Sequence, residues 1–253
     1  MNGSATTQDL IDRFDPITIE EMDRVKLQNR MDTKYAFSEA ELPGILQGML
    51  IDYRLLVVEN TRGTAYRSLY FDTAGLRSYL DHHNGRTFRS KTRFREYVGS
   101  DLVFLEVKRK TGRGGTDKAR KQVARIPEQL DADDQAFVRA ASGYDEAMHP
   151  VLWNHFTRLT FVHRTRAERL TLDRDLSFND ALNTRSLKGL CIAELKEERA
   201  DRDSPFAQLM RDRRIRPSGL SKYCTGLILL GLAPKHNTFK AAMERVARMT
   251  QAA

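Results

Sequence analysis

The sequence predicts an α+β fold in which helices flank one large antiparallel sheet. About eight or nine segments are rich in β-branched and aromatic residues, and short turn-forming stretches separate most of them. Apolar residues at helical spacing recur between and after these segments. A chain of 253 residues can bury one large core, and no repeat or low-complexity linker marks a boundary. We therefore expect a single domain over residues 1–253.

The N-terminal third is predicted to begin with two helices. Apolar residues at near-helical spacing indicate a helix over 14–28. A Ser-x-x-Glu capping pattern at Ser38 indicates a second over 38–52, which kinks or begins afresh near Pro43. The other elements expected in this third are a short strand over 34–37, a hairpin over 53–73 with its turn at 60–63, and a short helix over 74–82.

The centre of the chain is predicted to be strand-rich. Strands over 90–97 and 102–110 are joined by a Gly-Ser-Asp turn, and a third over 117–126 follows a Gly-rich turn. A helix over 127–142 is expected to begin at Pro127, because the fixed φ of proline suits a first helical turn. The C-terminal part is expected to hold strands over 154–165, 168–178 and 190–198, then helices over 204–215, 220–232 and 237–249.

Positive charge is concentrated in one segment. Residues 89–126 carry 12 Lys and Arg residues against 4 Asp and Glu residues, an excess equal to the +8 of the whole chain. In the strand over 90–97 the residues Lys91, Arg93 and Arg95 share one face. A local field of this kind attracts phosphates, nucleic acid or acidic membranes.

Two arrangements of the charged strand faces fit this alternation. If the apolar faces form an ordinary core, the charges meet water, and on periodicity alone this is the favoured interpretation because solvated faces are common in antiparallel sheets. If the apolar faces pack outward against helices, the charges turn inward, where each is costly unless it is paired or solvated. The second arrangement requires a wet interior and an anionic ligand.

Several common sites are missing from the sequence. It has no Gly-x4-Gly-Lys-Ser/Thr loop, and the Gly-rich stretch TGRGGTDKARK lacks the strand-to-helix context of a dinucleotide fingerprint. The DHH stretch over 81–83 has no supporting His/Asp cluster and is interpreted as a helix end. Cys191 and Cys224 lie in apolar runs, which indicates buried thiols rather than a disulfide or zinc site.

The chain is expected to be cytoplasmic. Two cysteines in apolar surroundings suit a reducing compartment. The N-terminus lacks the pattern of a signal peptide, and the most apolar stretch, YCTGLILLGLA, is too short to span a bilayer. No pattern specifies an oligomeric state.

Eight short motifs follow one another along the chain: NRMDTKY, YRSLYFDT, SKTRFREY, FLEVKRK, FTRLTF, ERLTLDRDL, IAELKEE and LSKYCTGL. In this order they resemble the polyphosphate polymerase (VTC) domain of the triphosphate tunnel metalloenzyme (CYTH-like) superfamily. The resemblance covers about residues 24–231 and leaves 232–253 as a C-terminal helix. It implies an antiparallel β-barrel of about eight strands whose inner wall of lysine and arginine grips a triphosphate. It therefore favours the inward-facing arrangement of the charges.

The resemblance also implies the residues of the site. A glutamate on a late strand binds a divalent cation in that family, which makes Glu194 the expected ligand for Mg²⁺ or Mn²⁺. Glu106 is expected to be a further acid of the metal site or a charge partner for Lys108. The residues expected to act on the nucleotide phosphates are Arg93, Arg95, Lys108, Arg158 and Lys222. Those expected to bind substrate alongside them are Arg30, Lys34, Lys91, Arg169 and Ser221.

The implied activity is metal-dependent transfer of the γ-phosphoryl group of ATP to a growing inorganic polyphosphate chain, with release of ADP. Related CYTH-type triphosphatases carry a Glu-x-Glu-x-Lys strand where this chain has NRMDTKY, which favours the polymerase branch. Hydrolysis of ATP or another organic triphosphate remains an alternative, as does a non-catalytic polyphosphate-binding module. Specific nucleic-acid binding is not expected, because only Phe94 and Tyr97 interleave the basic strands and no RRM-like signature occurs.

Overall fold

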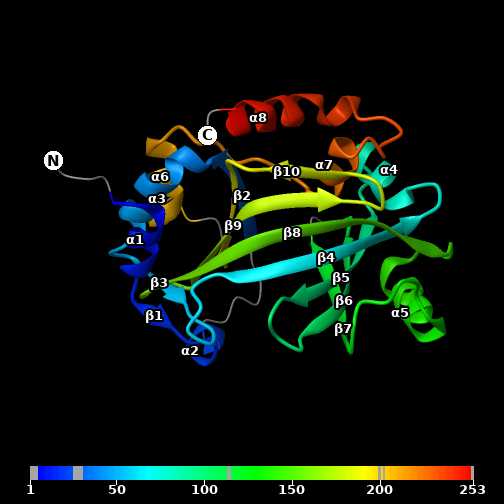
Figure 1. The fold of residues 1–253 in the computed structure, drawn as a ribbon, viewed down its shortest axis with the longest axis horizontal. Coiled ribbons are helices and arrows are strands. Elements are labelled where there is room, and N and C mark those ends of the chain that lie inside the picture. The colour runs from blue at the N-terminus through cyan, green and yellow to red at the C-terminus, as the bar shows by residue number, and fades with distance from the viewer. Residues whose placement is uncertain (1–4, 25–30, 113–114, 199–200, 202, 252–253) are drawn as a thin grey trace.

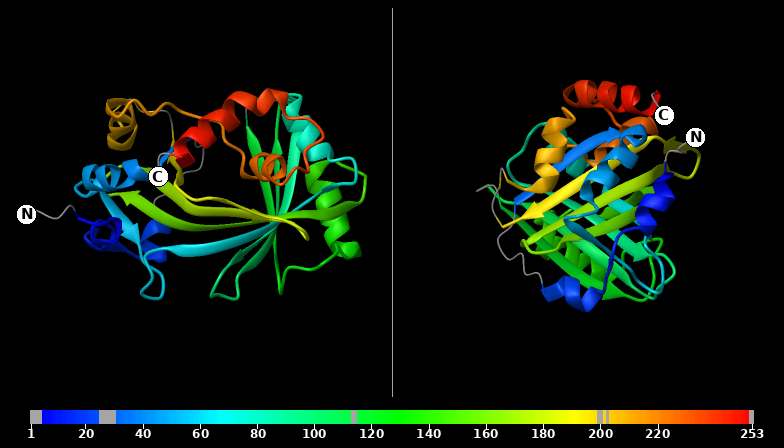
Figure 2. Two further views of the ribbon diagram at one scale, coloured as in Figure 1. Left: turned by 45° about the horizontal axis from the view of Figure 1, so that its top comes forward. Right: turned by 90° about the vertical axis from the view of Figure 1, so that its left-hand side faces the viewer.

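The computed structural model describes residues 5–24, 31–112, 115–198, 201 and 203–251. Its centre is a strongly curved sheet of eleven strands, shown in Figures 1 and 2. Eight of them form one antiparallel path in the order β2-β11-β9-β8-β4-β5-β6-β7. The bounds of these eight are β2 Met31–Ser38, β4 Thr64–Thr73, β5 Arg89–Tyr97, β6 Val103–Lys110, β7 Thr116–Val123, β8 Met148–His163, β9 Glu168–Asn179 and β11 Leu190–Glu197.

Three short strands lie beside this path. The parallel pair of β1 (Pro16–Ile17) and β3 (Tyr53–Leu56) joins the end of β8 through β3, and β10 (Thr184–Leu187) pairs with β9. The α-helices are α1 Thr7–Asp12, α2 Ile19–Arg24, α3 Leu42–Met49, α4 Arg77–His83, α5 Ala132–Ser142, α6 Pro205–Asp212, α7 Lys222–Leu229 and α8 Lys240–Gln251, with 3-10 turns at Glu39–Glu41 and Asn237–Phe239. The α+β class and the flanking helices are thus confirmed.

The expected barrel is corrected to an open, curved sheet. Within the described ranges no pairing joins the end strands β2 and β7. The free edge of β2 meets the segment before α7 instead: the amide of Ser218 donates to the carbonyl of Lys34 at 2.7 Å, and Pro217 forms an isolated bridge with Tyr35. Because proline has no amide hydrogen to donate, this contact cannot extend into a regular ladder through Pro217.

The expected hairpin over 53–73 is also wrong. Strands β3 and β4 do not pair with each other, since both pair along the same edge of β8, one after the other. With 16 residues, β8 is long enough to hold both. Only a tight turn remains between them, where Val58 bridges Thr61 and Glu59 and Asn60 adopt positive φ values.

Other differences concern where elements begin. The helix predicted over 14–28 is divided, because Pro16 and Ile17 pair with β3 before α2 starts, and residues 25–28 lie outside the described part of the chain. Helix α5 begins after Asp131, whose side chain accepts the amide of Asp134 at 2.7 Å, rather than at Pro127. Helix α1 and strand β10 were not expected from the sequence.

Helices cover the two faces of the sheet differently. On one face, α1, α3 and α6 pack at one end and α5 packs at the other, as Figure 1 shows. On the opposite face, α7 and α8 form an apolar cluster that includes Phe178, Ile192 and Val246. Gly226 lets α7 approach the sheet closely, because a Cβ at that position would lie 2.6 Å from the ring of Phe178. Val246 and Met249 of α8 therefore pack against the sheet.

None of the helices in the described part of the chain is long and apolar enough to cross a membrane.

Candidate functional site

Strand register places the predicted charged residues on the face of the sheet that also carries α7 and α8. Directly paired residues in antiparallel strands point to the same side of the sheet, so the register shows which side chains of neighbouring strands share a face. The pairs that show this are Lys34–Glu194, Arg158–Asp173, Arg93–Glu106 and Lys91–Lys108.

This face is concave. Burial lowers the pKa of Lys108, on β6, and the charge of Lys34 lowers it further, while Glu194 opposes the change. Lys34 and Glu194 lie on β2 and β11, at the other end of the hydrogen-bonded path. Lys34 and Glu194 act on Lys108 because the sheet curls. Figure 2 shows the green strands β5–β7 running at a steep angle to β8 and β9. We call this side of the sheet the concave face.

Glu106 is the centre of the first ionic cluster. Arg93 donates to its Oε2 through Nε at 2.8 Å and through Nη2 at 2.6 Å, and Lys118 of β7 pairs with its Oε1. The Arg95 guanidinium lies 3.9 Å away. Burial acts to raise the pKa of Glu106, whose side chain is 4% exposed, but Arg93, Arg95 and Lys118 outweigh it and hold that pKa well below its usual range. Glu106 is therefore ionised and shared by three cations.

Asp173 is the centre of the second cluster. Arg158 donates to it in a forked pair, Nε to Oδ1 at 2.6 Å and Nη2 to Oδ2 at 2.8 Å, and Lys222 Nζ reaches Oδ2 at 2.5 Å. The ring of Phe156 lies under both cations, 5.3 Å from the Arg158 guanidinium and 4.7 Å from Lys222 Nζ. Burial acts to raise the pKa of Asp173, but Arg158 and Lys222 hold it well below its usual range.

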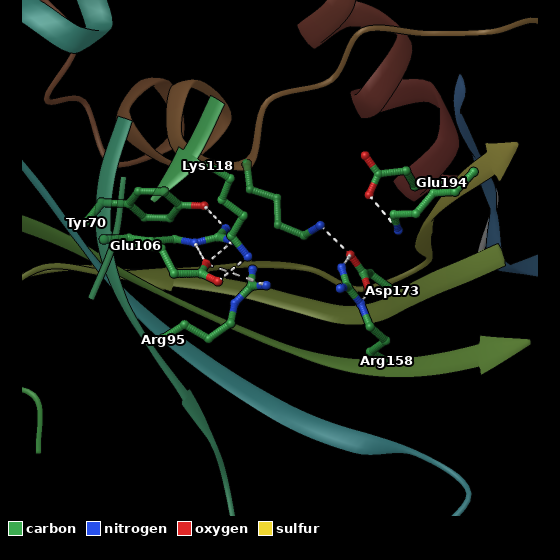
Figure 3. A network of polar contacts seen from close by, with 10 residues as sticks. Tyr70, Arg95, Glu106, Lys118, Arg158, Asp173 and Glu194 are labelled. Atoms are coloured by element: carbon green, nitrogen blue, oxygen red, sulfur yellow. Dashed lines mark hydrogen bonds and ion pairs between the residues drawn. The ribbon is translucent and has the colours of Figure 1, made fainter. Parts of the chain in front are cut away.

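Glu194 is the centre of the third cluster. Its Oε1 lies 3.2 Å from Lys34 Nζ and its Oε2 lies 3.2 Å from Lys196 Nζ. Burial acts to raise the pKa of Glu194, but Lys196 and Lys34 keep it far below its usual range. Burial also lowers the pKa of Lys196 to about 8, against the opposing attraction of Glu194. Figure 3 shows Glu106, Asp173 and Glu194, each joined by dashed lines to basic side chains.

The surroundings of the two predicted metal ligands differ. Mg²⁺ usually keeps several waters and takes one or two carboxylates together with phosphate oxygens. Glu194 fits that mode, because it is ionised, is 18% exposed and faces the same side as Asp32, which pairs in register with Lys196. Both residues are shared by cations, but Glu106 is only 4% exposed, which favours its other expected role as a charge partner. Its partners are Arg93 and Lys118 rather than the expected Lys108. No group of three His, Cys, Asp or Glu residues in the described ranges could hold a metal alone.

The remaining predicted residues are placed as follows. Lys91 Nζ lies 2.8 Å from Ser221 Oγ, at the start of α7. Arg169 donates to the carbonyl of Met22 at 3.0 Å, at the edge of the concave face. Arg30 lies outside the described residues.

Sequence reasoning did not single out three residues of the clusters. Two of them could have been predicted from strand alternation: Asp173 is in phase with Arg169 on one strand, and Lys196 is in phase with Glu194 on another. No sequence pattern pointed to Lys118, because its contact with Glu106 depends on the register of β7 against β6.

The concave face has a large excess of positive charge. Among the described residues, the carboxylates on this side include the three cluster centres, Asp32 and Asp72, which accepts from the hydroxyl of Tyr223 on α7. Nine cations accompany them: Lys34, Lys91, Arg93, Arg95, Lys108, Lys118, Arg158, Lys196 and Lys222. The arrangement suits a polyanion that is longer than a single phosphate.

Comparison with known proteins gives one family match. The model of the VTC domain matches residues 29–230. A search of curated proteins finds no match. Among solved structures, the Hippeastrum protein HpAC1, described as having a dominant triphosphatase activity, is similar at 16% identity and a TM-score of 0.49, over 81% of this chain and 98% of that one. The PH1819 protein of Pyrococcus horikoshii OT3 is similar at 14% identity and a TM-score of 0.42, over 79% of this chain and 99% of that one. At TM-scores below 0.5, neither likeness carries an argument about activity.

Proposed function

The chain belongs to the VTC domain family, and on that premise we propose that its concave face binds the triphosphate of ATP and transfers the γ-phosphoryl group to the end of an inorganic polyphosphate chain. ADP is the other product. The observation that supports this most is the sharing of each central carboxylate between two or more cations, with further cations in excess.

The clusters provide the contacts that condensed phosphates need. Arginine presents a planar fork that matches two oxygens of a phosphoryl group, and lysine acts as a mobile point charge. Arg93 and Arg158 already hold carboxylates through two nitrogens each. Phosphoryl oxygens can take the place of those carboxylate oxygens without a change in the type of contact.

Phosphoryl transfer depends mainly on positioning and charge neutralisation. Arg93, Arg95 and Arg158 would orient the triphosphate of ATP, and Lys108 and Lys222 would neutralise charge on the departing and arriving oxygens. A divalent cation held by Glu194 and by phosphate oxygens would supply Lewis-acid stabilisation when bound. Inward-facing aromatic rings such as Phe156 and Tyr66 pack under the arginines and limit the space for water.

The protonation states of the three central carboxylates favour transfer to phosphate over hydrolysis. A phosphate chain end is already anionic and needs no base, whereas attack by water is helped by a base with a pKa near neutrality. The carboxylates Glu106, Asp173 and Glu194 are poor bases, because cations hold their pKa values well below the usual range.

One observation favours a triphosphatase as the second candidate. Lys196 is largely buried, with Nζ 3.2 Å from Oε2 of Glu194, the expected metal ligand. Burial lowers its pKa to about 8, so its amine would be able to accept a proton from water bound there. The same cationic face would then bind an organic triphosphate and release free phosphate.

The proposed setting is the cytoplasm. Both cysteines, Cys191 and Cys224, are buried free thiols, which fits a reducing compartment that contains ATP.

The test is a product balance. Purified protein is incubated with ATP and either Mg²⁺ or Mn²⁺, and ADP, free phosphate and polyphosphate are measured together. Polymer in an amount that matches ADP supports the polymerase, and free phosphate without polymer supports the triphosphatase. Salt-sensitive binding of polyphosphate without any turnover would support a non-catalytic binding module instead of an enzyme.

A further inference from the structure

A hydrogen-bonded cluster beside the concave face joins α4, β5 and α7. The ammonium of Lys91, on β5, lies 2.8 Å from Nδ1 of His82, on α4, and 2.8 Å from Oγ of Ser221, which caps α7. The amide of Cys224 donates to the same Oγ at 3.3 Å, and the Cys224 thiol lies 3.1 Å from His82 Nδ1. None of these contacts was expected from the sequence.

His82 is held as a neutral acceptor. Burial lowers the pKa of Lys91, but as an ammonium it can only donate. Nδ1 of His82 then accepts, and the imidazole proton sits on Nε2. Burial lowers the pKa of His82 to about 3, and the charged groups that act on it, Lys91, Arg89, Lys110 and Lys34, are all cations that lower it further. The Phe239 ring meets the imidazole edge-on at 5.5 Å between centroids.

The cluster also fixes the direction of the Ser221 hydroxyl. A serine oxygen has two acceptor sites and one proton to donate. Lys91 and the Cys224 amide occupy the acceptor sites, so the proton must point away from both. No acceptor for it occurs in the part of the chain that the structure describes. The next residue, Lys222, lies on Asp173 at the concave face, so the hydroxyl is available to an anion bound beside it.

We infer that His82 is a positioning residue that holds Lys91 against Ser221, so that the Ser221 hydroxyl donates to a phosphoryl oxygen of a bound condensed phosphate. The same contacts fix the start of α7, from which Lys222 projects. This inference rests on the proposed function, because it needs a phosphate chain on the concave face.

The test is a double-mutant cycle with inorganic tripolyphosphate as the probe and calorimetric titration as the readout. His82→Leu removes the acceptor and should weaken binding about tenfold, as expected for the loss of a hydrogen bond to a charged group. His82→Asn returns an acceptor near the Nδ1 position and should bind within about threefold of the wild type. In a Lys91→Met background, His82→Leu should add less than about a twofold loss, because its effect passes through Lys91. His149→Leu, at an exposed histidine, is the control.

Two results would overturn the inference: unchanged affinity in His82→Leu, or an equal loss in the presence and absence of Lys91, which would mean that His82 only supports packing. Nitrogen NMR of the wild type tests the geometry without any substitution, since it should show the Nε2–H tautomer, and an Nδ1–H tautomer would contradict it. If the wild type itself does not bind tripolyphosphate, the proposed function fails, and this inference fails with it for that separate reason.

Discussion

Arg158 on β8 and Asp173 on β9 meet in a forked ion pair, with Nε–Oδ1 at 2.6 Å and Nη2–Oδ2 at 2.8 Å, and Lys222 of α7 joins the same carboxylate. The pair connects the long central strands to the helix that packs on the concave face. A phosphoryl group offers the guanidinium the same two-oxygen geometry. Asp173 thus serves as an internal counter-ion for two cations that we propose to bind phosphate.

Asp173→Asn should separate stability from ligand binding. Without ligand, the variant leaves Arg158 and Lys222 poorly compensated and should lose about 3 kcal/mol of unfolding free energy. Tripolyphosphate should then stabilise the variant more than the wild type, because it replaces the missing negative charge. Denaturant unfolding with and without tripolyphosphate measures both effects. Asp175→Asn, at a half-exposed neighbour on β9, is the control, and equal ligand stabilisation in wild type and Asp173→Asn would contradict the account.

Arg95→Ala should reduce turnover about 10²- to 10³-fold, the usual cost of removing one donor to a transition state. Arg95 is buried on the concave face beside Glu106, with its guanidinium 5.2 Å from the centre of the Tyr66 ring. Arg67→Ala is the matched control, because Arg67 lies on the opposite face and pairs with Glu96. Steady-state rates of both variants and the wild type measure this effect, and circular dichroism checks that the variants are folded. A wild-type rate in Arg95→Ala would show that Arg95 is not part of the site.

Glu194→Gln should abolish the response to metal while leaving the cations in place. The substitution keeps the shape of the side chain and removes its charge, so tripolyphosphate should bind at least as tightly as in the wild type when no metal is present. Added Mg²⁺ or Mn²⁺ should no longer raise turnover. Calorimetric titration and rates over a metal series measure the two effects. The same metal dependence in variant and wild type would rule out Glu194 as the ligand.

Lys196→Met should distinguish transfer from hydrolysis. If water attack uses the Lys196 amine, whose pKa is lowered by burial to about 8, release of free phosphate should fall at least about tenfold, whereas chain synthesis should keep most of its rate. Free phosphate and polymer are measured in the same incubation. A parallel loss of both products would show that Lys196 acts in substrate binding instead.

Stability should fall as the pH rises from about 4.5 to about 7. Burial and the charge of Glu168 raise the pKa of Glu197 from 4.5 to about 7, and the two residues are directly paired across β9 and β11. Because the folded state holds this proton more tightly than the unfolded state, its contribution is fully present below about pH 4.5 and is lost as the pH passes 7. The loss should be on the order of 2–3 kcal/mol. Denaturant midpoints across this range measure it, and Glu197→Gln should remove this part of the slope. An unchanged slope in that variant would show that other groups cause it.

The alternation of residues in the strands predicted which side chains share a face. Lys91, Arg93 and Arg95 fall on one side of β5, and Glu194 and Lys196 on one side of β11, because a strand repeats every two residues. Alternation could not say which face the helices cover. The interpretation favoured by periodicity alone, a solvated charged face, is wrong, since buried Glu106 and Asp173 lie on that face and the family resemblance gave the right orientation.

Contacts between elements that are distant in the chain could not be predicted from the sequence. The hairpin over 53–73 failed because one long strand, β8, pairs with both of its halves. The His82–Lys91–Ser221 cluster depends on how α4 and α7 dock on β5, which no local pattern encodes. The closed barrel failed because no pairing among the described residues joins β2 and β7, and Pro217 and Ser218 meet the free edge of β2 instead.

The most direct test of the central claim follows the label from ATP labelled in its γ-phosphoryl group, in wild type and in Arg158→Ala. We expect the wild type to move the label into chains that run as polyphosphate on a gel, with one ADP formed per phosphoryl group transferred. We expect Arg158→Ala, folded as judged by circular dichroism, to transfer little or none. Label that stays in ATP in the wild type, or equal transfer by Arg158→Ala, would contradict the claim that the concave face carries out phosphoryl transfer.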